Sequence, residues 1–201
     1  MPPVTTALIV ANVAIYLLQS LLPGLVVPFA LWPLGASQMD PRVGFAPWQL
    51  VTYAFLHGGL MHLAFNMFAL WMFGGMVERV FGTRRYLMYY FACVVSAALT
   101  QLAFSVFSGG IYPTVGASGG VFGLLLAYAR YFPDNRVMLL FPPIPMRART
   151  FVLLYAAIEL FLGVTGTQEG VAHFAHLGGM VGGFALLRHW HGPSGRSRIT
   201  R

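Results

Sequence analysis

The sequence predicts an all-α membrane protein, built as a bundle of six transmembrane helices with a long interfacial loop between the first two spans. Three observations lead to this fold class. Of the 201 residues, 58% are hydrophobic and only 8% are charged, whereas soluble domains carry about 25% charged residues. The mean hydropathy is +0.72. The apolar residues also fall into long runs, and a helix needs roughly 20 of them to cross a bilayer.

Six apolar runs define the predicted spans. They cover residues 5–22, 60–80, 85–106, 117–132, 149–165 and 170–188. Residues 1–188 are therefore expected to form a single membrane domain, and residues 189–201 a basic cytoplasmic tail. The run Met1-Pro2-Pro3-Val4 lacks the basic residues that precede the apolar part of a cleaved signal peptide. We therefore expect the first run to be a retained span.

The stretch from 23 to 58 differs from the runs on either side. Its frequent prolines exclude a continuous helix. They are Pro23, Pro28, Pro33, Pro41 and Pro47. Trp32, Phe45 and Trp48 are aromatic residues of the kind found at the headgroup level of a bilayer. We interpret this stretch as an outer loop that rests partly in the membrane interface and contains short helices.

The arginines predict the orientation of the chain. All twelve basic residues are arginine, and only Arg42 falls on the outer side of the six-span arrangement. The others flank the turn between spans two and three, the turn between spans four and five, and the C-terminal tail. Because basic residues favour the cytoplasmic side, we expect both termini in the cytoplasm, in a multi-pass protein of the bacterial inner membrane. This distribution indicates contact with membrane lipids and excludes a nucleic-acid-binding face.

A serine opens the fourth predicted span, in the turn Gly116-Ala117-Ser118-Gly119-Gly120. The glycines permit a tight loop, and the free backbone N–H groups of a helix start can stabilise an oxyanion. The alternative is that these small residues serve helix packing alone.

A histidine in the sixth span is the candidate base for this serine. His176 lies in Ala175-His176-Leu177-Gly178-Gly179, and it falls at the same predicted depth as Ser118. Gly119 and Gly123 are four residues apart, and so are Gly179 and Gly183. Small residues at this spacing let helices approach closely. An ionisable residue inside a membrane indicates function, and a Ser–His pair supports nucleophilic catalysis.

The second span supplies further polar residues. His62 and Asn66 are four residues apart, so they share one face of a helix and can donate hydrogen bonds to an oxyanion. His57 precedes that helix and is expected to tie down the loop. A zinc site is an alternative interpretation of these histidines, but the chain has no His-Glu-x-x-His pattern and no acid or cysteine at ligand spacing. We therefore expect no metal and no cofactor.

None of the five acidic residues is an obvious third member of a triad. Glu78 lies at the inner end of span two beside Arg79, and Asp40 and Asp134 fall in loops. Glu159 lies within span five, where a proton relay or, preferably, a hydrogen-bonded structural role is expected. The sequence therefore predicts a dyad.

Together these motifs resemble the rhomboid family of intramembrane serine proteases, over residues 5–188. The resemblance implies that Ser118 is the nucleophile and His176 the general base. It also implies an oxyanion hole of His62, Asn66 and the Ser118 backbone N–H. Its implied substrates are single-span membrane proteins, cut at or near the outer end of their helix. The residues expected to shape the site are Gly116, Gly119, Phe122, Gly179 and His57.

Two positions depart from the family pattern. Gln49 follows Trp48, where many members have an arginine that anchors the outer loop, and Phe122 stands where some members have a tyrosine stacked on the catalytic histidine. Phenylalanine can still stack. Two other hypotheses remain: a catalytically inactive relative that binds membrane proteins, and a transporter or channel. The first would lack Ser118 or His176, and the second would need a polar stripe through the whole bundle.

Overall fold

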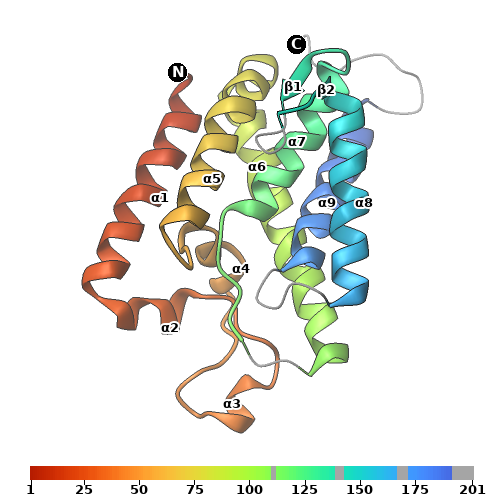
Figure 1. Cartoon of the computed structure of the whole chain (residues 1–201). Coiled ribbons are helices and arrows are strands. Elements are labelled where there is room, and N and C mark those ends of the chain that lie inside the picture. The colour runs from red at the N-terminus through yellow and green to blue at the C-terminus, as the bar shows by residue number, and fades with distance from the viewer. Residues whose placement is uncertain (110–111, 139–142, 167–171, 192–201) are drawn as a thin grey trace.

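The computed structural model describes residues 1–109, 112–138, 143–166 and 172–191. Long helices run side by side, and the N-terminus and the end of the last helix lie at the same end of the bundle (Figure 1). The long helices are α1 (Pro3–Leu21), α5 (Leu60–Ala69), α6 (Gly75–Ser108), α7 (Ser118–Tyr131), α8 (Ala148–Thr165) and α9 (His173–His191). A π-helical turn, η3 (Leu70–Gly74), joins α5 to α6.

These helices lie where the apolar runs predict helices. The boundary between predicted spans two and three falls inside α6, at Gly82, whose φ of 72° and ψ of 162° interrupt the helix. The chain reverses direction there, because glycine adopts positive φ without steric cost. The first residues of the predicted sixth span, and most of the predicted basic tail, lie outside the described residues.

Three described helical segments are long and apolar enough to cross a membrane. They are Pro3–Leu21, Leu60–Phe107 (the continuous run that contains Gly82) and Ala148–Thr165. Helix α7 has only 14 residues, about 21 Å at 1.5 Å per residue. It is short because the segment before it is extended. Leu31 and Thr114 form an isolated antiparallel bridge that holds this segment against the loop from 23 to 58.

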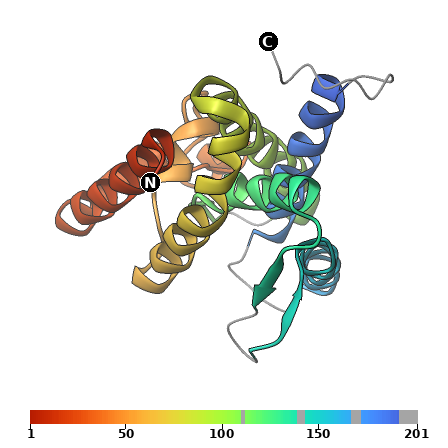
Figure 2. The same ribbon diagram turned by 90° about the horizontal axis from the view of Figure 1, so that it is seen from above.

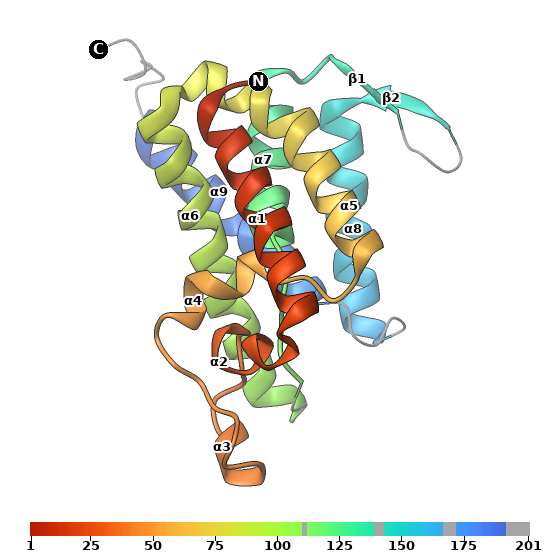
Figure 3. The same ribbon diagram turned by 90° about the vertical axis from the view of Figure 1, so that its left-hand side faces the viewer.

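The loop between α1 and α5 contains several short helices at one end of the bundle (Figure 3). They are η1 (Pro23–Leu25), α2 (Val26–Phe29), α3 (Ala36–Met39), α4 (Gln49–Thr52) and η2 (Tyr53–Phe55). Buried Gln49 ties the loop together. Its Nε2 donates to the carbonyl oxygens of Gly44 (3.0 Å) and Pro28 (3.3 Å). Its Oε1 accepts from the backbone N–H of Trp32 (3.2 Å).

A short hairpin between α7 and α8 departs from the predicted all-α fold. Strands β1 (Arg136–Met138) and β2 (Pro145–Arg147) pair antiparallel, with Val137 opposite Met146. The hairpin projects at the side of the bundle, next to α8 (Figure 2). Each strand has three residues, too few for a period-two pattern to stand out in the sequence.

Helix α7 packs between α6 and α9 at positions without side chains. A Cβ added to Gly179 would collide with the backbone oxygen of Gly119, so the backbones of α9 and α7 touch there. A Cβ on Gly119 would lie 2.5 Å from Cβ of Ala97 on α6. Close backbone approach at small residues is how membrane helices pack, and here it sets the distance between Ser118 on α7 and His176 on α9.

Buried Glu78 attaches α6 to the start of α1. Its carboxylate accepts hydrogen bonds from the backbone N–H of Val4 (2.9 Å), the N–H of Thr5 (2.7 Å) and the hydroxyl of Thr5 (2.7 Å). The first N–H groups of a helix have no partner within the helix, and the positive end of the helix dipole favours a carboxylate. Glu78 therefore caps α1 from another helix.

Candidate active site

Ser118 is the first residue of α7, and the chain reaches it through a glycine in an unusual conformation. Gly116 has φ of 129°, a value that side chains with a Cβ rarely adopt. Its N–H donates to the carbonyl oxygen of Tyr53 (3.0 Å). A Cβ at this position would lie 2.7 Å from Cε1 of His62. Backbone conformation and steric space therefore both require glycine beside the serine.

His176, four residues into α9, faces Ser118. Its Nε2 lies 2.8 Å from the serine Oγ. The ring of Phe122 stacks on the imidazole, with ring centroids 4.3 Å apart and an interplanar angle of 5°. Phe122 lies one turn after Ser118 on α7, so the helix that carries the hydroxyl also positions the imidazole.

His62 and Asn66 of α5 line the same cavity as Ser118 of α7. The Nδ1 of His62 accepts a long hydrogen bond from the Gly58 N–H (3.4 Å), which places the ring hydrogen on Nε2. That nitrogen lies beside Gly116, at 2.8 Å from an added Cβ. The amide of Asn66 donates to the His62 carbonyl oxygen (2.9 Å). An amide NH₂ has two hydrogens, so one remains for a ligand.

His57 supports His62 from the loop before α5. The two rings meet edge to face, with centroids 5.1 Å apart. Gln19 of α1 holds the His57 backbone through both groups: the His57 N–H donates to Gln19 Oε1 (3.0 Å), and Gln19 Nε2 donates to the His57 oxygen (2.6 Å). Burial, followed by the proximity of His62, lowers the pKa of His57 to about 4. His57 is therefore neutral at pH 7.

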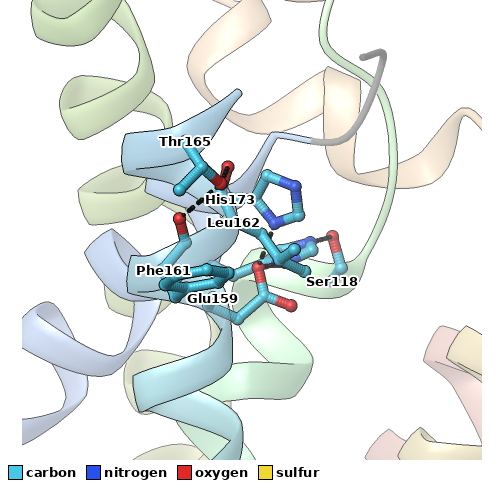
Figure 4. Close-up of polar contacts among 7 residues, drawn as sticks. Ser118, Glu159, Phe161, Leu162, Thr165 and His173 are labelled. Carbon is cyan, nitrogen blue, oxygen red and sulfur yellow. Dashed lines mark hydrogen bonds and ion pairs between the residues drawn. The ribbon is translucent and has the colours of Figure 1, made fainter. Parts of the chain in front are cut away.

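An acidic residue also reaches the site, which the sequence does not predict. Oε2 of Glu159, on α8, lies 2.9 Å from Nδ1 of His176 and 2.7 Å from Nδ1 of His173. Figure 4 shows Ser118, Glu159 and His173 gathered from separate helices. The available signals were an acid within an apolar run and two histidines three residues apart, hence on one helix face. Neither signal indicates that α8 turns this carboxylate toward α9.

The candidate site opens into a cavity of about 780 Å³. Its polar lining includes Ser118, His176, His62, Asn66 and Glu159. The remainder is mainly apolar and comes from α5, η3, α7, α8, β1 and the segment before α7. A hydroxyl paired with an imidazole, next to N–H donors, can perform nucleophilic acyl transfer.

Residues 45–191, most of the chain, match the profile of the Rhomboid domain family. The chain belongs to the rhomboid family. The rhomboid protease GluP of Bacillus subtilis (strain 168) is 36% identical over 137 residues, which is 68% of this chain and 25% of that protein. The rhomboid protease GlpG of Yersinia pseudotuberculosis serotype I (strain IP32953) is 29% identical over 196 residues, covering 94% of this chain. GlpG of Klebsiella pneumoniae (strain 342) is 29% identical over 187 residues, covering 92% of this chain.

This rhomboid chain spans about a quarter of the length of GluP and 62% of the length of the two GlpG proteins. Membership of the rhomboid family, together with the long apolar helices, makes it a multi-pass integral membrane protein.

Proposed function

We propose that this protein is an intramembrane serine endopeptidase that hydrolyses peptide bonds in transmembrane substrates. The observation that carries the proposal is the 2.8 Å contact between Ser118 Oγ and His176 Nε2, at the wall of a cavity of about 780 Å³. A hydroxyl this close to an unprotonated imidazole nitrogen can lose its proton as it attacks a carbonyl carbon.

The proposed reaction has two halves. Ser118 attacks the peptide carbonyl while His176 takes its proton, and the oxyanion is held by His62, Asn66 and the backbone N–H of Ser118. His176 then gives the proton to the leaving amine, which leaves an acyl group on Ser118. His176 then takes a proton from a water molecule whose oxygen attacks the acyl carbon, and it returns this proton to Ser118 Oγ as the acyl–serine bond breaks.

In the membrane we propose six spans in one domain over residues 1–188, a basic tail from 189 to 201, and both termini in the cytoplasm of a bacterial cell. The loop from 23 to 58 then lies at the outer interface, and the site opens toward the outer leaflet. Single-span substrates would be cut at or near the outer end of their helix. Helix-weakening glycine or proline near the bond should favour cleavage, because they lower the cost of exposing it.

The test is cleavage of a single-span substrate in reconstituted membranes. Ser118→Ala and His176→Ala should each abolish cleavage. Ser105→Ala and His189→Ala are matched controls, because the Ser105 hydroxyl donates to the Leu102 carbonyl oxygen of the same helix and His189 is exposed on α9. Asn66→Ala should slow the reaction on the order of 10²–10³-fold through loss of one oxyanion donor. Equal cleavage by the parent and the Ser118→Ala variant would end the proposal.

A further inference from the structure

Glu159 holds two histidines of α9 with one carboxylate oxygen. Oε2 lies 2.7 Å from Nδ1 of His173 and 2.9 Å from Nδ1 of His176. Glu159 is only 7% exposed and His173 only 5% exposed. A buried carboxylate is costly unless hydrogen bonds compensate it. Here the compensating donors are the two imidazole rings, and one of them faces Ser118.

The shared oxygen decides which ring nitrogens carry hydrogen. An ionised carboxylate only accepts hydrogen bonds, so Nδ1 of each histidine must donate. Nε2 of His173 is buried and meets no hydrogen-bond partner in the described parts of the chain. A second proton there would be an unsatisfied donor. The hydrogen bonds of the described residues therefore fit a His173 ring with one hydrogen, carried by Nδ1.

The same constraint acts on His176 with a different consequence. With hydrogen on Nδ1, the neutral ring presents the lone pair of Nε2 to Ser118 Oγ, 2.8 Å away. This tautomer is the one that can accept the serine proton. The opposite tautomer would present an N–H to the hydroxyl and could not act as a base.

Hydrogen bonding explains the spacing of these three residues better than a shared metal ion does. Glu159, His173 and His176 bring potential ligand atoms within 4.8 Å of one another. A tetrahedral zinc ion bound at about 2.0–2.1 Å would hold its ligand atoms about 3.3 Å apart. The two carboxylate–imidazole distances, 2.7 and 2.9 Å, are shorter than that and match charge-assisted hydrogen bonds.

We propose that Glu159 is a positioning residue for His176, which adds a third group to the dyad; this inference rests on the proposed serine protease function. The carboxylate keeps hydrogen on Nδ1 of His176 and stabilises the imidazolium that forms when Ser118 gives up its proton. The proton moves from Ser118 Oγ to His176 Nε2 and then to the leaving amine, while Glu159 stays ionised. His173 holds the carboxylate in place from the other side.

Two substitutions of Glu159 distinguish the effect of its hydrogen-bond acceptor from the effect of its negative charge. Glu159→Gln keeps an oxygen that can accept from Nδ1 but removes the negative charge. Glu159→Leu, of similar size, removes both. We expect kcat to fall in the order parent, Gln, Leu, with a loss on the order of 10²-fold or more for Leu and little change in KM. Thr150→Val on the same helix is the control, because Thr150 is exposed and does not line the cavity, and it should keep the parent's kcat.

The second readout is the tautomer itself, measured by ¹⁵N NMR on protein with labelled histidine and assigned with a His176→Gln sample. The parent should show His176 protonated at Nδ1 and unprotonated at Nε2, whereas Glu159→Leu should show a mixture or the opposite tautomer. Thermal unfolding identifies variants that have simply lost their fold. A folded Glu159→Leu protein with the parent's kcat and tautomer would overturn the inference. An inactive parent that still shows the Nδ1–H tautomer would instead count against the proposed function.

Discussion

At the scale of single residues, the glycine two positions before Ser118 is restricted in two ways. Gly116 combines a positive φ with a steric limit: a Cβ there would lie 2.7 Å from the His62 ring. The strain and the collision act on different properties, because strain lowers stability while the collision displaces a proposed oxyanion donor. A substitution can therefore separate them.

Gly116→Ala should reduce cleavage on the order of 10²-fold or more, since displacing one oxyanion donor has that effect. The matched control is Gly35→Ala. Gly35 also has positive φ (93°) but nothing within 4 Å of an added Cβ, so it shares the backbone cost of about 1–3 kcal/mol without the collision. Cleavage rates per folded molecule provide the comparison. Equal rates for the two variants would contradict this role of His62.

The sequence indicates some residues of the candidate site and of the loop, but it does not indicate others. Ser118 and His176 can be found because each lies in a short glycine-containing motif that begins or interrupts an apolar run. Glu159 has no such motif, and a helix with apolar residues on every side does not reveal which face meets its neighbour. Gln49 is likewise foreseeable only as a missing arginine. Its actual role, three hydrogen bonds within the loop, depends on a tertiary fold that no local pattern encodes.

At the scale of elements, we expect Glu78 to hold the start of α1 against α6. Glu78→Ala removes three charge-assisted hydrogen bonds, each worth about 1.5–3 kcal/mol, so the free energy of unfolding in detergent should fall by about 4.5 kcal/mol or more. Asp134→Ala is the control: within the described residues this exposed acid forms two ion pairs, at 3.5 and 3.6 Å, and exposed pairs contribute about 0–1 kcal/mol. Similar losses for both variants would show that the cap of α1 is unimportant.

The long loop before α5 offers a second test at this scale. Gln49→Ala should lower the unfolding free energy by about 1–3 kcal/mol, through three lost hydrogen bonds of about 1 kcal/mol each, and should speed proteolysis within residues 23–58. Gln38→Ala, in the same loop but exposed, should leave both measurements unchanged. If the two glutamine variants behave alike, Gln49 does not replace the arginine anchor.

The sequence predicts the positions of the helices better than it predicts the tertiary contacts between them. Apolar runs place the helices to within a few residues, because burial in lipid requires long uninterrupted helices. The hairpin β1–β2 is too short to stand out in the sequence, whereas the reversal at Gly82 falls in the gap between the predicted spans 60–80 and 85–106. The short length of α7 follows from the extended segment pinned by Leu31 and Thr114, a pairing between residues 83 positions apart.

At the scale of the whole molecule, buried His57 makes stability depend on pH. Its pKa is lowered to about 4, against about 6.5 in an unfolded chain. Below pH 6.5 the unfolded state therefore binds a proton that the folded state does not. The stabilising contribution of neutral His57 is complete above pH 6.5 and decreases as the pH falls toward 4.

Unfolding midpoints between pH 7.5 and 4.5 test this directly. The parent should lose stability across the interval, and His57→Gln should lose less, since glutamine does not titrate. His189→Gln, at an exposed histidine, should follow the parent. Parallel curves for parent and His57→Gln would show that His57 does not carry the acid sensitivity.

The central claim concerns a single reactive hydroxyl in a membrane-embedded bundle, and covalent labelling tests it most directly. A serine-directed fluorophosphonate, followed by mass spectrometry, should modify Ser118 in the folded parent. The adduct should be absent from Ser118→Ala and form much more slowly in His176→Ala, which lacks the base. No adduct on Ser118 in the folded parent, or equal labelling with and without His176, would contradict the account.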